Sequence, residues 1–138
     1  MSTADSSYVG EVVDRFVHDT VGVTDALVVS ADGVGLTVSD GLPAAVAEPF
    51  GAIVAGLVSL TRGAARCFAE DRAERVVVEL DQSYLQVSEI TAWAVLGVVA
   101  RTDADIGLVA YEMSLVAERL APELSAELVT EIRTGSAV

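Results

Sequence analysis

Lysine and asparagine are absent from the 138 residues, and cysteine and histidine occur once each. The eight basic residues are therefore all arginine, and they face 21 acidic residues, which gives a formal net charge of −13. Without lysine the chain cannot form a Walker A loop, whose lysine contacts the nucleotide phosphates. The surplus of negative charge also argues against nucleic acid and anionic lipid as partners, because phosphate binding needs a basic surface.

The residues of common catalytic and metal sites are missing as well. One cysteine and one histidine leave no disulfide, CxxC pair or HExxH motif, and neither GxSxG nor GxGxxG occurs. We interpret Cys67 as a small core residue and His18 as a partner of a helix C-terminus. Asp103 and Asp105 fit the N-terminus of a helix better than a carboxylate pair for catalysis or metal. We therefore expect no enzymatic activity, no cofactor and no metal ion.

Hydrophobic residues make up 52% of the chain, which is enough for a folded core in one domain. The first residues, MSTADSSYVGEVVDRF, lack the basic and apolar regions of a signal peptide. The uncharged run from Pro49 to Thr61 is shorter than the ~18 residues of a membrane span. These features predict a cytoplasmic protein with no direct membrane insertion.

Periodicity and turn residues predict the element order α-β-β-α-β-β-β-α. The expected helices are residues 4–19, 49–70 and 106–120, with a loose turn at 43–48 and a short helical segment at 123–133. The expected strands are residues 25–30, 34–38, 75–80, 84–89 and 92–100, with the last strand central because it is apolar on both faces.

This order indicates an α+β fold with a five-stranded antiparallel sheet. We expect the long helix and a shorter helix on one face and a C-terminal helix on the other. Residues 1–121 are predicted to form a single domain, and residues 122–138 a C-terminal helical extension and tail.

The long helix has two sides with different side chains. Its larger apolar residues are spaced by three and four positions, which predicts that they face the core: Val46, Phe50, Ile53, Leu57, Leu60, Ala64 and Cys67. The opposite side is small, with Gly51, Ala55, Ser59 and Gly63, and no charge occurs between Glu48 and Arg62. A solvated helix face carries charges, and each interior glycine costs about 1 kcal/mol relative to alanine. The small side is therefore predicted to pack against a second copy of the same helix.

The strand at residues 75–80 is predicted to be an edge strand. Its run of three valines contains no proline, and such an edge invites aggregation unless it is covered. We expect it to pair with its twin across a two-fold axis. The predicted dimer interface comprises Gly51, Ala55, Ser59, Arg62, Gly63, Arg75, Val76, Val77, Val78 and Glu79.

Two segments resemble the Roadblock family of dynein light chains and bacterial GTPase regulators. They are GVTDALVVSADGVGL, with its Asp32-Gly33 hairpin, and WAVLGVVARTDADIGLVAYEM, in which a strand leads to an aspartate-capped helix at Ile106-Gly107. The resemblance covers roughly Tyr8 to Leu120. A lysine-free chain with an extension from Pro122 resembles the actinobacterial members, which are often encoded beside a sensor kinase and a small Ras-like GTPase.

The resemblance implies a homodimer whose sheets join edge to edge, with the long helices side by side. It also implies binding to a small Ras-like GTPase, sometimes with faster GTP hydrolysis, in a complex that can include a sensor kinase. Arg62 and Arg66 are the best candidates for a catalytic arginine finger, but we favour their interpretation as solvated residues that pair with Glu70. Two alternatives remain open: a ligand-sensing module with polar groups at Gln86, Ser88 and Thr91, or a purely structural assembly subunit.

Overall fold

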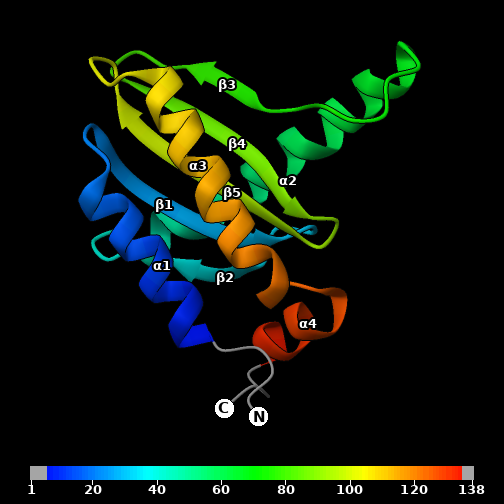
Figure 1. Ribbon diagram of the computed structural model, residues 1–138, viewed down its shortest axis with the longest axis horizontal. Coiled ribbons are helices and arrows are strands. Elements are labelled where there is room, and N and C mark those ends of the chain that lie inside the picture. The colour runs from blue at the N-terminus through cyan, green and yellow to red at the C-terminus, as the bar shows by residue number, and fades with distance from the viewer. Residues whose placement is uncertain (1–5, 135–138) are drawn as a thin grey trace.

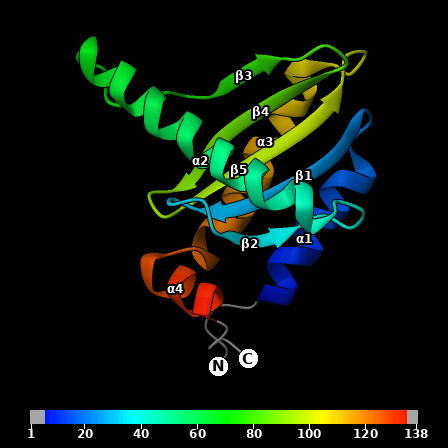
Figure 2. The same cartoon turned by 180° about the vertical axis from the view of Figure 1, so that it is seen from behind.

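The computed structural model describes residues 6–134 and shows a five-stranded antiparallel sheet with helices on both faces (Figures 1 and 2). The strand order is β2-β1-β5-β4-β3. The strands are β1 (Val23–Ser30), β2 (Gly35–Val38), β3 (Val76–Glu79), β4 (Ser83–Thr91) and β5 (Ala94–Arg101). The helices are α1 (Ser6–Asp19), α2 (Ala44–Cys67), α3 (Ile106–Leu120) and α4 (Ala126–Thr134), with a 3₁₀ turn at Ala121–Glu123.

The α+β class, the element order and the number of strands are confirmed. β5 is the central strand and β3 an edge strand, as predicted. Element bounds differ from the expected ones by a few residues, and α3 agrees at both ends. Residues 4 and 5 of the expected first helix, and the tail at 135–138, lie outside the described residues.

The expected distribution of helices over the two faces is wrong. α1 packs beside α3 on one face, where Val9, Val13 and Phe16 share a core with Val109 and Met113. α2 lies by itself on the other face (Figure 2). The apolar stripe of a helix shows that one side is buried, but it does not show against which face of the sheet.

Side-chain alternation along β5 divides the core into two layers. Ala94, Leu96 and Val98 belong to the layer under α1 and α3, whereas Val95 belongs to the layer under α2. Both layers are built mainly from aliphatic side chains, and the sheet is buried on both faces along its centre. Gln86 is a fully buried polar residue at this centre, and its Nε2 donates to the carbonyl oxygen of Ile106 at 3.4 Å.

α2 begins earlier than expected. Pro43 is its N-cap in an extended conformation, and the helix continues through Pro49, which was the expected start. Pro49 lies in the second turn, so the helix loses one backbone hydrogen bond near an end where several are already missing. By length and composition α2 is the one helix among residues 6–134 that could cross a membrane; in the fold, one side of it is packed on the sheet.

α2 approaches the sheet closely at two glycines. A Cβ atom at Gly97 of β5 would lie 2.7 Å from Cγ2 of Val54, and one at Gly51 would lie 3.0 Å from the carbonyl oxygen of Gly33. At Gly97 a methyl group requires Val54 to shift, and at Gly51 it requires the Gly33 backbone to give by a few tenths of an ångström. The glycines thus set the distance between the helix and the sheet.

α4 extends the α1/α3 layer toward β2. Leu124 and Val129 are buried in that core, and the Thr91 hydroxyl donates to the carbonyl oxygen of Leu124 at 2.8 Å. Arg133 forms an ion pair with Asp32 in the β1–β2 turn at 3.1 Å. The boundary at residue 121 between a domain and an extension stays a prediction.

Candidate functional site

α2 packs on the sheet with a different side from the one expected from the sequence. The residues that face the sheet are mostly small, and they are Gly51, Val54, Ala55, Val58 and Ala65. The expected core stripe is largely in solvent: Val46 is 48% exposed, Ile53 55% and Leu60 73%. The prediction that this stripe faces the core is therefore wrong for its exposed members, whereas Phe50 and Leu57 are half-buried and pack against the core under α2. At Gly97 the sheet contacts Val54 of α2 so closely that no additional methyl group fits.

An open apolar groove lies between α2 and the sheet, and we call it the α2 groove. Its volume is about 650 Å³. Phe50, Ile53 and Leu57 form one wall, and Val78 and Leu85 contribute to the sheet side. Asp25 is the one charged residue of its lining. In water such a surface is unfavourable, since each apolar side chain that is covered contributes roughly 1.5–3 kcal/mol when fully buried.

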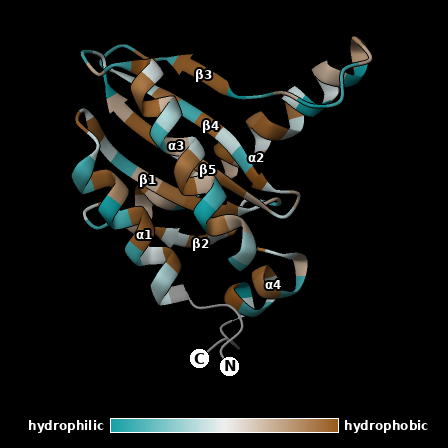
Figure 3. Ribbon diagram, viewed as in Figure 1, coloured by the Kyte–Doolittle hydropathy of each residue, from teal (hydrophilic) through white to brown (hydrophobic). Residues whose placement is uncertain are grey.

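The β3 edge adjoins the α2 groove. β3 pairs only with β4, and its other edge has no strand neighbour among the described residues. Val77 is 44% exposed and Leu80 49%, and Figure 3 shows β3 as hydrophobic. The C-terminal end of α2 projects past this side of the sheet (Figure 2). The exposed groove, strand edge and projecting helix are continuous in space.

The predicted interface residues divide into three groups. Gly51 and Ala55 are buried against the sheet of the same chain, so their assignment to a second copy is wrong. Arg62 forms an ion pair within the chain, with Glu89 at 2.7 Å. The others stay predictions: Ser59, Arg75, Val77 and Glu79 are exposed, and Gly63, Val76 and Val78 are half-buried.

Sequence reasoning missed Ile53, Leu60 and Phe68 as surface residues, although Phe68 is 80% exposed. The signal was present, because α2 has two uncharged sides and a single sheet face can cover only one of them. Which side of α2 faces the sheet became clear only from the close contact between Gly97 and Val54.

The expected pair of Arg62 with Glu70 is wrong, because Arg62 pairs with Glu89 instead. Its guanidinium reaches across to β4, and Nη2 donates to Oε1 of Glu89. This hydrogen bond and the carboxylate charge raise the pKa of Arg62. The pair connects the projecting half of α2 to the sheet.

Asp103 and Asp105 have local structural roles. Asp105 caps α3, with its Oδ1 accepting from the Leu108 amide at 3.0 Å, and Asp103 pairs with Arg101 at 3.2 Å. Cys67 is exposed, so its assignment to the core is wrong. Within residues 6–134 no group of three or more His, Cys, Asp or Glu side chains could hold a metal ion.

Comparison with known proteins agrees with this architecture. The model of the Roadblock/LC7 domain family matches residues 9–100. A Roadblock/LC7 domain from Streptomyces avermitilis is 32% identical, with a TM-score of 0.78 over 82% of this chain and 94% of that one.

Two more distant structures share the fold. MglB from Myxococcus xanthus is 18% identical, with a TM-score of 0.76 over 83% of this chain and 93% of that one. The gliding protein MglB from Thermus thermophilus is 21% identical, with a TM-score of 0.72 over 98% and 95% of the two chains. No curated protein matched the chain.

Proposed function

Because the chain belongs to the Roadblock/LC7 domain family, we propose that it is a non-enzymatic homodimeric module that binds a small Ras-like GTPase. The observation that carries the dimer is the α2 groove beside the open β3 edge. The GTPase rests on the resemblance of the sequence to bacterial GTPase regulators. A sensor kinase in the same complex, and faster GTP hydrolysis, are part of the same proposal.

The geometry of the groove favours a second copy as its occupant. Two β3 edges that pair about a two-fold axis make one continuous sheet and cover both unpaired strands. The same rotation brings each projecting α2 end toward the other subunit's groove. Ile53, Leu60 and Phe68 are then covered, and because each is more than half exposed, each can add about 1–2 kcal/mol.

An Ile53→Asp variant tests the dimer. Ile53 lines the α2 groove, so a carboxylate there has to be desolvated when the second copy docks. We expect light scattering to show a dimer for the unmodified chain at micromolar concentration and a folded monomer for the variant. Leu108→Asp is the matched control, because Leu108 is similarly exposed, at 45%, but lies on α3 across the sheet.

A monomeric unmodified chain, or a dimer lost equally in both variants, would show that the α2 groove is not the dimer interface. A structure in which β3 is covered by something other than its twin would contradict the pairing of edges.

Binding of the GTPase needs a separate measurement. We would titrate the chain with a small Ras-like GTPase from the same organism, loaded with GDP or with a non-hydrolysable GTP analogue, and follow the heat of binding. The net charge of −13 favours a GTPase with a basic surface and predicts weaker binding as salt rises. Equal affinity for both nucleotide states would contradict a regulatory role, and no binding in either state would contradict the GTPase as partner.

A further inference from the structure

The sheet has an opening between residues 73–75 and residues 88–89, which we call the β4 seam. β3 pairs with β4 only from Val76 with Val87 to Glu79 with Tyr84. β4 continues to Thr91, and beyond Val87 its ladder is with β5 alone. β3 therefore supplies no ladder partner to the C-terminal half of β4.

The backbone of Glu89 points into this opening. The Leu80 amide donates to the carbonyl oxygen of Ser83 at 2.8 Å, which makes these two residues a hydrogen-bonded pair of the β3–β4 ladder. In an antiparallel ladder such pairs recur at every second residue. On β4 the series continues through Leu85 and Val87 to Glu89, where β3 no longer supplies a partner.

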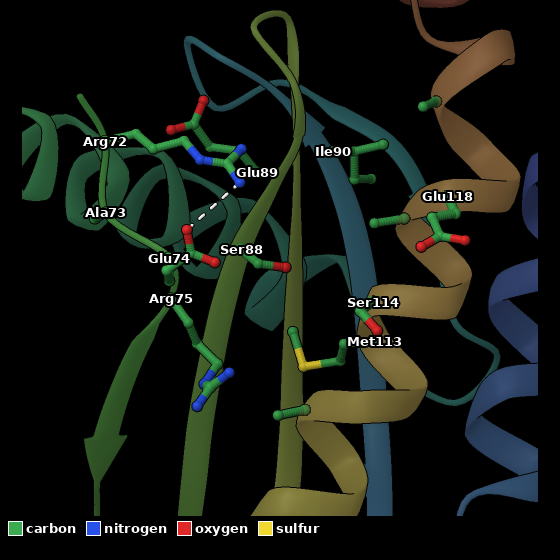
Figure 4. Close-up of a pocket in the computed structure, with 13 residues that line it drawn as sticks. Arg72, Ala73, Glu74, Arg75, Ser88, Glu89, Ile90, Met113, Ser114 and Glu118 are labelled. Carbon is green, nitrogen blue, oxygen red and sulfur yellow. Dashed lines mark hydrogen bonds and ion pairs between the residues drawn. The ribbon is translucent and has the colours of Figure 1, made fainter.

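Cavities border the β4 seam on both faces of the sheet. On the α3 side lies a pocket of about 350 Å³, between residues 72–75 on one side and α3 on the other (Figure 4). Met113 and Ile90 give it an apolar lining, and it is open because α3 presents small residues there, such as Ala110 and Ala117. On the α2 side, Val58 and Thr61 line a far smaller cavity of about 10 Å³, which shares residues 73–75, 88 and 89 with the first.

Two charges at the pocket have no partner. Arg72 pairs with Glu74 at 3.4 Å, and Glu89 pairs with Arg62. Among the described residues, Arg75 and Glu118 line the pocket from opposite walls with no ion pair or hydrogen bond of their side chains (Figure 4). Within the described part of the chain, the pocket thus has an apolar floor between two unpaired charges, the cation of Arg75 and the anion of Glu118.

We propose that the β4 seam binds an extended peptide segment of another protein, which adds a short strand beside Ser88–Thr91. The peptide residue opposite Glu89 exchanges two backbone hydrogen bonds with it, as in other cases of strand addition. Its two neighbours lie opposite Ser88 and Ile90, so their side chains point toward Met113 and should be apolar. An acidic and a basic residue at the two ends complement Arg75 and Glu118. This site is separate from the α2 groove and does not depend on the proposed dimer or GTPase.

Peptide binding can be followed by NMR with the ¹⁵N-labelled full chain. The probe is the acetylated, amidated peptide Glu-Val-Thr-Val-Arg. Its matched controls carry one N-methyl group, either on the central threonine, whose amide faces β4, or on the first valine, whose amide faces away. We expect saturable shifts at Ser88, Glu89 and Ile90. Methylation of the threonine should weaken binding about fivefold or more, and methylation of the valine less than about twofold.

A variant of the chain tests the pocket itself. Ala117→Leu fills the α3 side of the pocket and should weaken binding about fivefold or more, as expected when apolar side chains lose their site. Tyr111→Leu changes the same helix on its exposed side, where Tyr111 is 58% exposed, and should leave the affinity unchanged. The amide spectra of both variants report whether they are folded.

Several outcomes would overturn the proposal. They are the absence of binding at millimolar peptide, equal binding of the two N-methyl peptides, and shifts centred on Val77 at the outer edge of β3. The proposal would also be overturned if the Glu89 amide exchanged slowly without peptide and this protection were lost when the protein is diluted. That result would show that a second copy of the chain already fills the β4 seam.

Discussion

Gly97→Ala should destabilise the protein, because β5 and α2 are in contact there with no space for a methyl group. The new Cβ would lie 2.7 Å from Cγ2 and 3.3 Å from Cγ1 of Val54, and 3.4 Å from Cδ1 of Leu27. Val54 and Leu27 are both fully buried, so neither can rotate into solvent. The helix has to move off the sheet or the backbone has to bend, and overpacking of this kind typically costs about 1–3 kcal/mol.

A double-mutant cycle isolates this contact. Val54→Ala alone removes two buried methyl groups and should cost about 1–3 kcal/mol. In the double variant the alanine at position 97 occupies part of the vacated space. The sum of the single effects should therefore exceed the effect of the double variant by about 1 kcal/mol or more.

Urea unfolding followed by far-ultraviolet circular dichroism measures these free energies, at one protomer concentration for all variants. Gly56→Ala is the control, because Gly56 is in α2, the helix that carries Val54, and a Cβ at Gly56 meets no atom within 4 Å. It should be neutral or stabilising by up to about 1 kcal/mol. A Gly97→Ala protein within about 0.5 kcal/mol of the unmodified one, or an additive cycle, would refute the contact as the determinant of the helix position.

Ala69→Gly should stabilise the chain by about 1 kcal/mol, measured by the same unfolding assay, because Ala69 has φ 58° after the end of α2, where glycine carries no Cβ penalty. The pKa of Asp32 is lowered from 3.8, mainly by the hydrogen bond that the Ser30 hydroxyl donates. The ionised carboxylate therefore contributes to the free energy of unfolding above pH 3.8, and this contribution is lost as the pH falls below that value. Ser30→Ala should flatten stability against pH in this acidic range, and an unchanged slope would contradict the assignment. If the chain stimulates a GTPase, Arg62→Ala and Arg66→Ala should weaken binding modestly and reduce saturated turnover by less than tenfold. An inserted catalytic arginine contributes about 10³-fold or more to turnover. A larger loss of turnover with binding preserved would therefore identify one of these residues as an arginine finger.

Local sequence signals were sufficient for the elements themselves. α3 begins and ends where the sequence indicates because Asp105 supplies its cap within the same short segment. The central place of β5 follows from its lack of polar residues, since only a strand covered on both faces can be so apolar. The edge position of β3 was likewise predictable from a short valine run between charged residues. These features depend on residues close together in the chain.

The candidate site was only partly predictable. The sequence showed that α2 is too apolar on all sides for one sheet face, and hence that some surface of it awaits a partner. It did not show which surface, since both sides lack charge between Glu48 and Arg62. The β4 seam was not visible at all, because it arises from the difference in length between β3 and β4 once they are paired.

The α+β class, the order of elements and the presence of a surplus apolar helix surface were predictable from the residues alone, because periodicity and turn chemistry act over a few residues. The packing of the elements was needed to show that α1 lies with α3, and that Gly51, Val54 and Ala55 of α2 face the sheet while Ile53 and Leu60 face outward. The physical reason is steric. Gly97 lies against Val54 across a contact with no room for a Cβ, so the sheet accepts the helix side that approaches most closely, and the larger side chains are left for a partner.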